Sequence, residues 1–143
     1  MTSQTTTTVQ TLATAGAVLA VGVAGFQSAL ALGLPLGDAV FGGRAPTVNG
    51  VLTAPFRLLA VAQALVLLAV AWLLLVRAGV VTHPAIGGGS LTMATWVLAG
   101  FLALNTVGNL AAPHPVERWI MGTITLLLTG IAVVVALRAP ALA

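Results

Sequence analysis

Apolar residues follow one another along this chain in four long runs, separated by segments rich in glycine, proline and charged residues. Each run has the ~20 residues that a helix needs to cross the hydrocarbon core of a bilayer. The runs cover about residues 12–34, 56–76, 92–111 and 116–137. They predict an all-α fold, a four-helix transmembrane bundle over residues 11–139, in a multi-pass protein of the inner or plasma membrane that contacts membrane lipids.

The N-terminal part of the chain gives weaker signals. Residues 1–10 are uncharged and rich in threonine, so we expect a disordered polar tail. The first apolar run can also be interpreted as a signal peptide that is cleaved after Ala31. No Lys or Arg precedes the run, however, and it exceeds the ~7–15 apolar residues usual in such a peptide, which favours a retained helix.

The connection between the first two helices, residues 35–55, is long for a bundle, in which most connections have ~2–8 residues. Its three prolines and four glycines end the first helix and exclude a continuous one. It also carries apolar residues, among them Val40 and Phe41. These residues predict that the long first loop lies on the bundle or dips into it.

Strongly polar side chains gather at one end of the predicted bundle. Because consecutive helices run in opposite directions, late positions of the first and third helices share a leaflet with early positions of the second and fourth. The side chains in this leaflet are Gln27, Arg57, Gln63, Asn105, Asn109, Glu117, Arg118, Thr123 and Thr125. At 1.5 Å per residue the amides lie ~6–12 Å below the interface. The opposite half of the bundle is almost entirely Ala, Val, Leu and Gly.

Two interpretations of these polar residues stay open. The amides could form hydrogen bonds between helices and only stabilise the bundle, each by ~0.6–2 kcal/mol. Such bonds should be scattered over both leaflets, whereas a polar pocket open to one side gathers them in one leaflet, as here. The second interpretation predicts ligand-binding roles for Gln27, Arg57, Gln63, Asn105, Asn109, Arg118 and Thr125.

The only two carboxylates, Asp38 and Glu117, lie near the mouth of this predicted pocket. They could neutralise Arg57, Arg118 or Arg44 in interfacial ion pairs that anchor the long loop, or act on a ligand as general acid and base, which makes both candidate catalytic residues. We expect Glu117 to be an anchor at a helix N-terminus, where a carboxylate is favourable. We expect Asp38 to be the functional acid, because it lies on a glycine-bounded loop with no helix to stabilise.

Composition excludes several classes of protein. With 59% hydrophobic and 5% charged residues and a mean hydropathy of +1.15, the chain lacks the polar residues to cover a water-soluble globule. Five scattered arginines form no basic patch, so no nucleic-acid partner is expected. There is no cysteine, and the two histidines lie on opposite sides of the bundle, so no metal, haem or other cofactor is expected.

Short motifs give one resemblance. They are Gly33-Leu-Pro-Leu-Gly37-Asp38, Phe41-Gly-Gly-Arg44, Arg57, Gly108-Asn109-Leu110 and Glu117-Arg118. Together they resemble a family of small four-helix bacterial integral membrane proteins that has no assigned activity. The resemblance implies fold and location, and it transfers no catalytic residue.

The function that the pattern favours is binding a lipophilic small molecule, and in an enzymatic version transforming it without a cofactor. Two alternatives remain. The chain could be a non-catalytic accessory subunit of a larger membrane complex, or a homo-oligomeric small transporter. The small multidrug exporters have a membrane-embedded glutamate in their first helix, where this chain has Gln27 and Ser28, so proton-coupled export is poorly supported.

Overall fold

The computed structural model describes residues 3–82 and 87–139 and is built almost entirely of helices. Long helices are α1 (Ser3–Leu32), α2 (Ala54–Arg77), α3 (Gly88–Leu110) and α4 (Gly122–Arg138). A π-helical segment, η3 (Val116–Met121), leads directly into α4. Two 3₁₀ turns, η1 (Gly37–Ala39) and η2 (Phe41–Gly43), and two short strands, β1 (Thr47–Val48) and β2 (Val51–Leu52), occupy the first connection.

Four helical segments are long and apolar enough to cross a membrane: α1, α2, α3 and the continuous stretch Val116–Arg138. The prediction of an all-α chain with four long helices is therefore confirmed. When η3 is counted with α4, the predicted boundaries lie within four residues of the observed ones, except at the start of α1. Four candidate spans indicate a multi-pass membrane protein.

The N-terminal residues differ from the expectation. Helix α1 begins at Ser3, so described residues that we expected in a disordered polar tail are helical. Threonine hydroxyls support these turns, because Thr7, Thr8 and Thr11 each donate to the carbonyl four residues earlier at 2.9–3.1 Å. Val9 is 2% exposed and packs in the main core. The tail was misjudged because a polar helix surface was interpreted as an absence of structure.

Glycines end α1 and α2 in the same way. After α1, Gly33 has a positive φ of 108°, its N–H donates to Leu30 O, and the N–H of Leu34 donates to Ala29 O. After α2, Gly79 has a φ of 70°, its N–H donates to Val76 O, and the N–H of Val80 donates to Leu75 O. This arrangement satisfies helix-end carbonyls, and it favours glycine because other residues rarely adopt positive φ.

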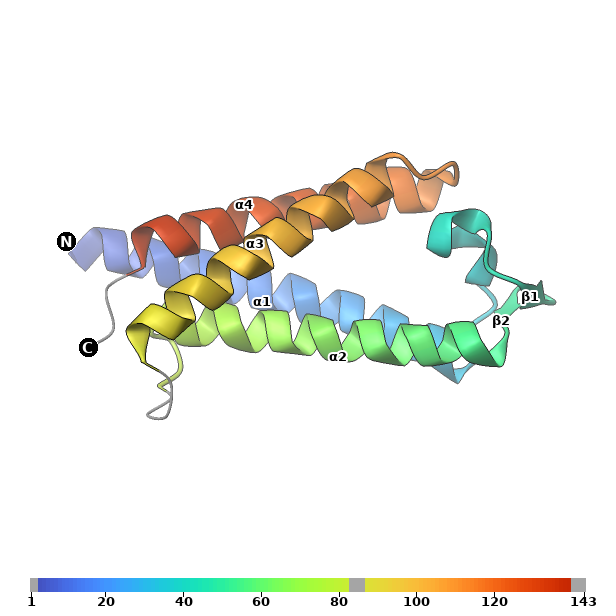
Figure 1. Ribbon diagram of the computed structural model, residues 1–143, viewed down its shortest axis with the longest axis horizontal. Coiled ribbons are helices and arrows are strands. Elements are labelled where there is room, and N and C mark those ends of the chain that lie inside the picture. The colour runs from blue at the N-terminus through green and yellow to red at the C-terminus, as the bar shows by residue number, and fades with distance from the viewer. Residues whose placement is uncertain (1–2, 83–86, 140–143) are drawn as a thin grey trace.

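The helices form two antiparallel hairpins, α1 with α2 and α3 with α4 (Figure 1). The hairpins lie close together at the end where α1 begins and α4 ends, and they diverge towards the end that contains the first connection (Figure 1). At the first of these ends all four helices share one core, built from small residues such as Ala13, Ala20 and Ala132 around Leu74 and Leu128. We call this the closed end.

A second, smaller core lies at the other end, which we call the open end. It joins α1 and α2 to the first connection through Leu30, Val40, Leu52 and Ala60, and no residue of α3 or α4 belongs to it. The connection turns back through a β-hairpin whose central residues are Asn49 and Gly50, with φ of 53° and 77°. Asn-Gly favours this tight turn, but we did not predict the hairpin.

Candidate functional site

A cavity of about 280 Å³ lies at the open end, between the two helix hairpins. All four long helices line it, and Val40 and Phe41 of the first connection line it as well. Its polar lining residues are Gln27, Gln63, Asn105, Asn109, Glu117 and Thr125. The structure therefore brings together the four amides and Thr125, which lie on four different helices and far apart in the sequence.

The exposure of the lining residues shows where the pocket opens. Lining residues from α1 and α4 are buried or half-buried, with Gln27 9% and Leu128 0% exposed. Most lining residues of α2 are exposed, with Leu59 49% exposed, and α3 contributes the 49% exposed Phe101 beside the buried Leu102. Gln63 and Asn105 belong to this exposed group. The pocket thus has its floor on α1 and α4 and its mouth between α2 and α3, part-way along both helices.

Few of the amides hold helices together. Asn109 Nδ2 donates to Thr125 Oγ1 at 3.3 Å, which joins α3 to α4. The buried Oε1 of Gln27 has no hydrogen-bond partner among the described residues. Within the same part of the chain, no hydrogen bond is made by the side chains of Gln63 or Asn105. Interhelical hydrogen bonding therefore accounts for one of the four amides, and three face the pocket with unused hydrogen-bonding capacity.

Glu117 connects the pocket to the first connection. It projects from the π-helical segment η3, and its Oε2 accepts a hydrogen bond from the Gly42 N–H at 2.6 Å. Gly42 has a φ of 72°, and the preceding Phe41 has a φ of 55°, which is unusual for a bulky residue. Phe41 packs edge-on against Phe56, with ring centroids 5.4 Å apart. Glu117 therefore fixes a tight turn that carries Val40 and Phe41 over the polar end of the pocket.

Asp38 lies outside the pocket, beside the β-hairpin of the first connection. It is exposed, it does not line the pocket, and its Oδ1 accepts a hydrogen bond from Thr47 Oγ1 at 2.7 Å. The neighbouring Gly37 packs so closely on the β-hairpin that an added Cβ would lie 2.9 Å from Gly50 O. This packing directs η1 towards the hairpin and away from the pocket. Of the two candidate catalytic acids, the structure brings Glu117 and not Asp38 to the pocket lining, although we expected Asp38 to be the functional acid.

The arginines cap helices. Arg57 Nε donates to Ala31 O at 2.6 Å, in the last turn of α1. Arg118 Nε donates to Ala112 O at 2.9 Å, just beyond α3. Neither arginine lines the pocket, so the structure does not bring Arg57 and Arg118 together with the four amides there. Among the described residues neither carboxylate forms an ion pair with an arginine, so the expected interfacial ion pairs are not found there.

The capping of helix C-termini by Arg57 and Arg118 could have been predicted from their positions in the sequence. Each lies in the first turns of a helix that returns antiparallel to the helix before it, and so it lies beside that helix's C-terminus. Carbonyls in a last helical turn have no partner within the helix, and the negative end of the helix dipole attracts a cation. Arg77 makes the equivalent contact at the closed end, where its Nη2 donates to Ala139 O at 3.3 Å.

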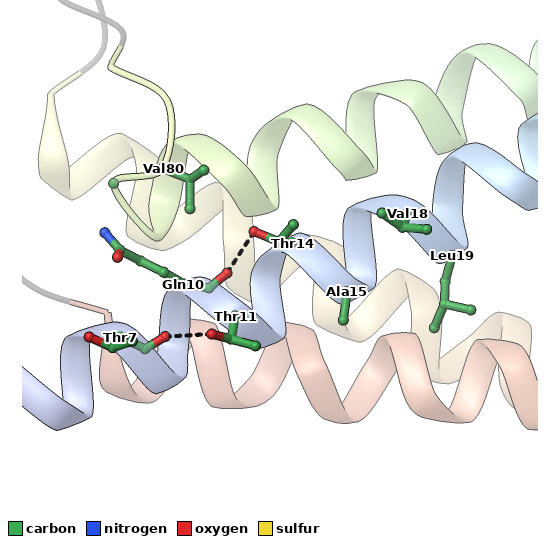
Figure 2. Close-up of a pocket in the computed structure, with 9 residues that line it drawn as sticks. Thr7, Gln10, Thr11, Thr14, Ala15, Val18, Leu19 and Val80 are labelled. Carbon is green, nitrogen blue, oxygen red and sulfur yellow. Dashed lines mark hydrogen bonds between the residues drawn. The ribbon is translucent and has the colours of Figure 1, made fainter.

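A larger hollow, of about 950 Å³, lies on the outside of the closed end. Its wall combines polar residues of the first turns of α1, such as Thr7 and Gln10, with the apolar Val18, Leu19 and Val80, as Figure 2 shows. The hydroxyls of Thr11 and Thr14 donate to carbonyls of their own helix (Figure 2). No charged residue lines this hollow, and its threonines have their hydrogen bonds satisfied. It is a surface groove, and the open-end pocket is the stronger candidate site.

Comparison of the chain with protein-family models, with curated proteins and with solved structures finds no match. Function therefore has to be argued from the geometry of the pocket.

Proposed function

We propose that this protein is a multi-pass protein of the inner or plasma membrane that binds a lipophilic small molecule in the open-end pocket. The observation that carries the proposal is Gln27, a 91% buried residue of the pocket lining whose buried Oε1 has no hydrogen-bond partner among the described residues. A buried polar group left unpaired is unfavourable by about 1–3 kcal/mol. A ligand that pairs with Gln27 removes this penalty.

The outer surface of the helices supports a bilayer location. Large apolar side chains point outwards on every long helix; examples are Val18, Leu58, Leu104 and Leu137, each more than 60% exposed. In water such a surface would be strongly unfavourable, but in lipid it is expected. The tryptophans also fit, because Trp119 lies at the open end and Trp96 near the closed end, where aromatic belts form.

The size and opening of the pocket indicate how a ligand would lie. Small-molecule pockets usually measure ~300–1,000 Å³, so a cavity of about 280 Å³ holds a head group and a few further atoms. The mouth between α2 and α3 is lined by apolar residues such as Leu59, Val66 and Phe101. We place the head group against the amides and the apolar remainder in this mouth, where it extends into the lipid.

Binding is supported better than catalysis or transport. Glu117 is the one acidic or basic side chain in the pocket lining, so the pocket offers a proton acceptor but no second group of the kind that acid–base catalysis commonly pairs with it. Transport needs a polar path into the second leaflet. Within the described residues the closed end is filled by the apolar core around Leu74 and Ala132 instead.

A photoreactive alkyl probe carrying a diazirine, with the protein in phosphatidylcholine nanodiscs, tests this proposal. We expect saturable labelling of peptides around Gln63 and Asn105, since a site fills while bulk lipid contact rises linearly. Leu126 and Leu127 on α4 are comparably exposed and lie outside the pocket lining, so their labelling should not saturate. Labelling that is non-saturable at all of these positions would refute the proposal.

The membrane crossings have a separate test, because the chain contains no cysteine. Single cysteines at Val48, on the β-hairpin, and at Val80, after α2, are both exposed. In intact cells or sealed vesicles a membrane-impermeant thiol reagent should label one of them from outside and the other only after permeabilisation. Labelling of both from the same side would contradict the proposed topology.

A further inference from the structure

We infer that the pocket selects a lipophile whose head group is a protonated amine, and that it rejects carboxylates and phosphates. This inference rests on the proposed function and names the chemical class of the ligand. It follows from the charge balance of the pocket lining, which contains one carboxylate, four amides, a threonine hydroxyl and no cationic side chain.

The carboxylate of Glu117 has capacity left for a ligand. Its Oε2 accepts from the Gly42 N–H, and no described residue donates to its Oε1. Oxygen atoms of a carboxylate only accept hydrogen bonds, so the group that completes this contact has to be a donor. A protonated amine has three N–H donors and a positive charge, and it satisfies the oxygen and the charge together.

Arg57 and Arg118, two arginines of the open end, do not supply the missing charge inside the pocket. Arg118 is adjacent to Glu117, yet its Nε donates to Ala112 O and it does not line the cavity. Arg57 donates to Ala31 O in the same manner. Both guanidinium groups are directed at helix C-termini, whose carbonyls carry partial negative charge. The negative charge of Glu117 is therefore the one formal charge that a bound head group meets.

The amides do not reverse this selectivity. A carboxamide presents an acceptor oxygen and a donor nitrogen, and a turn about its last side-chain bond exchanges them. Gln27, Gln63 and Asn105 can therefore serve a donor or an acceptor head group equally well. Glu117 cannot, because an anion placed beside it meets like-charge repulsion in a medium of low dielectric constant. The sign of the preferred charge is thus set by Glu117 and the neutral groups adapt to it.

Competition between three probes that share one alkyl chain tests the inference: dodecylamine, dodecan-1-ol and dodecanoate. Each competes with the diazirine probe in phosphatidylcholine nanodiscs, and concentrations are compared per bilayer volume so that partitioning cancels. We expect dodecylamine to compete at least ~10-fold more strongly than dodecanoate, with dodecan-1-ol between them, because one charge contact at reduced dielectric supplies that much. Equal or stronger competition by dodecanoate or dodecan-1-ol than by dodecylamine would overturn the inference.

Two charge-removing variants locate the effect. Glu117→Gln keeps the size of the side chain and an oxygen that can accept from Gly42, and we expect it to reduce the preference for amine over carboxylate to about 3-fold or less. Asp38→Asn removes the same charge outside the pocket and should leave the preference unchanged. An unchanged preference in Glu117→Gln would overturn the inference.

The two proposals fail in different ways. If no probe competes and the diazirine label does not saturate, the proposed binding function itself is wrong. If saturable binding is found and dodecanoate competes best, the pocket is confirmed and the amine inference is wrong. If Glu117→Gln does not fold, the ranking of the three probes on the native protein decides the inference by itself.

Discussion

The two ends of this bundle are made by the same four helices but pack in different ways. At the closed end small residues allow all four helices to share one core, in which Ala13, Ala20, Leu74 and Ala132 are 0% exposed. At the open end the hairpins separate, the core contains only α1, α2 and the first connection, and the space towards α3 and α4 is a pocket lined by amides. One end holds the helices together, and the other leaves a hollow between them.

The difference shows that residue composition gives the two ends of the same helices different roles. Without a hydrophobic driving force between helices in lipid, close van der Waals packing of small residues stabilises the assembly. The closed end supplies that packing, and it leaves the open end free to carry polar groups that contribute little to cohesion. Of the four pocket amides, only Asn109 makes a hydrogen bond to another helix within the described structure.

Truncation of one leucine at each end should give the largest contrast. Leu74→Ala at the closed end leaves a cavity around a fully buried side chain, and we expect a loss of ~2–5 kcal/mol in unfolding free energy. Leu59→Ala at the mouth of the pocket removes a side chain that is 49% exposed, and should lose less than ~1 kcal/mol. Reversible unfolding in mixed micelles measures both. Equal losses would show that the two ends pack alike.

Removal of the Glu117 contact should loosen the first connection and leave the closed end intact. Glu117→Ala leaves the Gly42 N–H without its acceptor, and we expect a loss of about 1.5–3 kcal/mol, the range for a hydrogen bond to a charged group. Hydrogen exchange should accelerate in residues 40–44 and not in the closed-end half of α4. Glu117→Gln, which retains an acceptor, is the matched control and should protect the segment more than Glu117→Ala does.

Replacement of Gln27 should raise the free energy of unfolding, whereas the preceding substitutions lower it. Gln27→Leu removes a buried polar atom that has no partner among the described residues, so we expect a stability gain of about 1 kcal/mol together with loss of ligand binding. Gln10→Leu makes the same change on the same helix at the surface groove of the closed end, and it should alter neither property much. Marked destabilisation by Gln27→Leu would mean that its amide is a structural contact.

Loss of one arginine cap should have the smallest effect. Arg57→Met keeps much of the apolar stem but removes the donor to Ala31 O, and we expect a loss of ~0.3–1 kcal/mol. Arg57→Lys, which keeps a donor and a positive charge, should recover part of it. Since Arg57 lies outside the pocket lining, the affinity for an alkyl probe should stay the same in both variants. A loss of affinity would show that Arg57 contributes to ligand binding.

Much of this architecture could be predicted from the sequence, because hydrocarbon permits few alternatives for an apolar run of spanning length. The one-sided placement of Gln27, Gln63, Asn105 and Asn109 followed from alternating helix directions, and the structure places all four on one cavity. Contacts of the first connection could not be predicted in this way. They depend on where a single turn directs its side chains, as Asp38 shows by pointing to Thr47.

The ion pairs that we expected of the arginines were wrong for a different reason. Charge counting suggested that Arg57 and Arg118 would pair with the two carboxylates, because opposite charges in one leaflet attract. That charge count left out the carbonyls of the last turn of each helix, which have no hydrogen-bond partner within the helix. The structure pairs both arginines with such carbonyls, so Glu117 keeps its charge for the pocket.

Native mass spectrometry of the detergent-purified protein tests the central claim most directly, since it detects a small molecule that remains bound. The pocket account predicts a lipophilic adduct on the native chain and on Gln10→Leu, and its loss from Gln27→Leu, which lacks the buried amide of the pocket lining. An adduct of the same mass and occupancy on Gln27→Leu, or a native chain that carries none, would contradict the account.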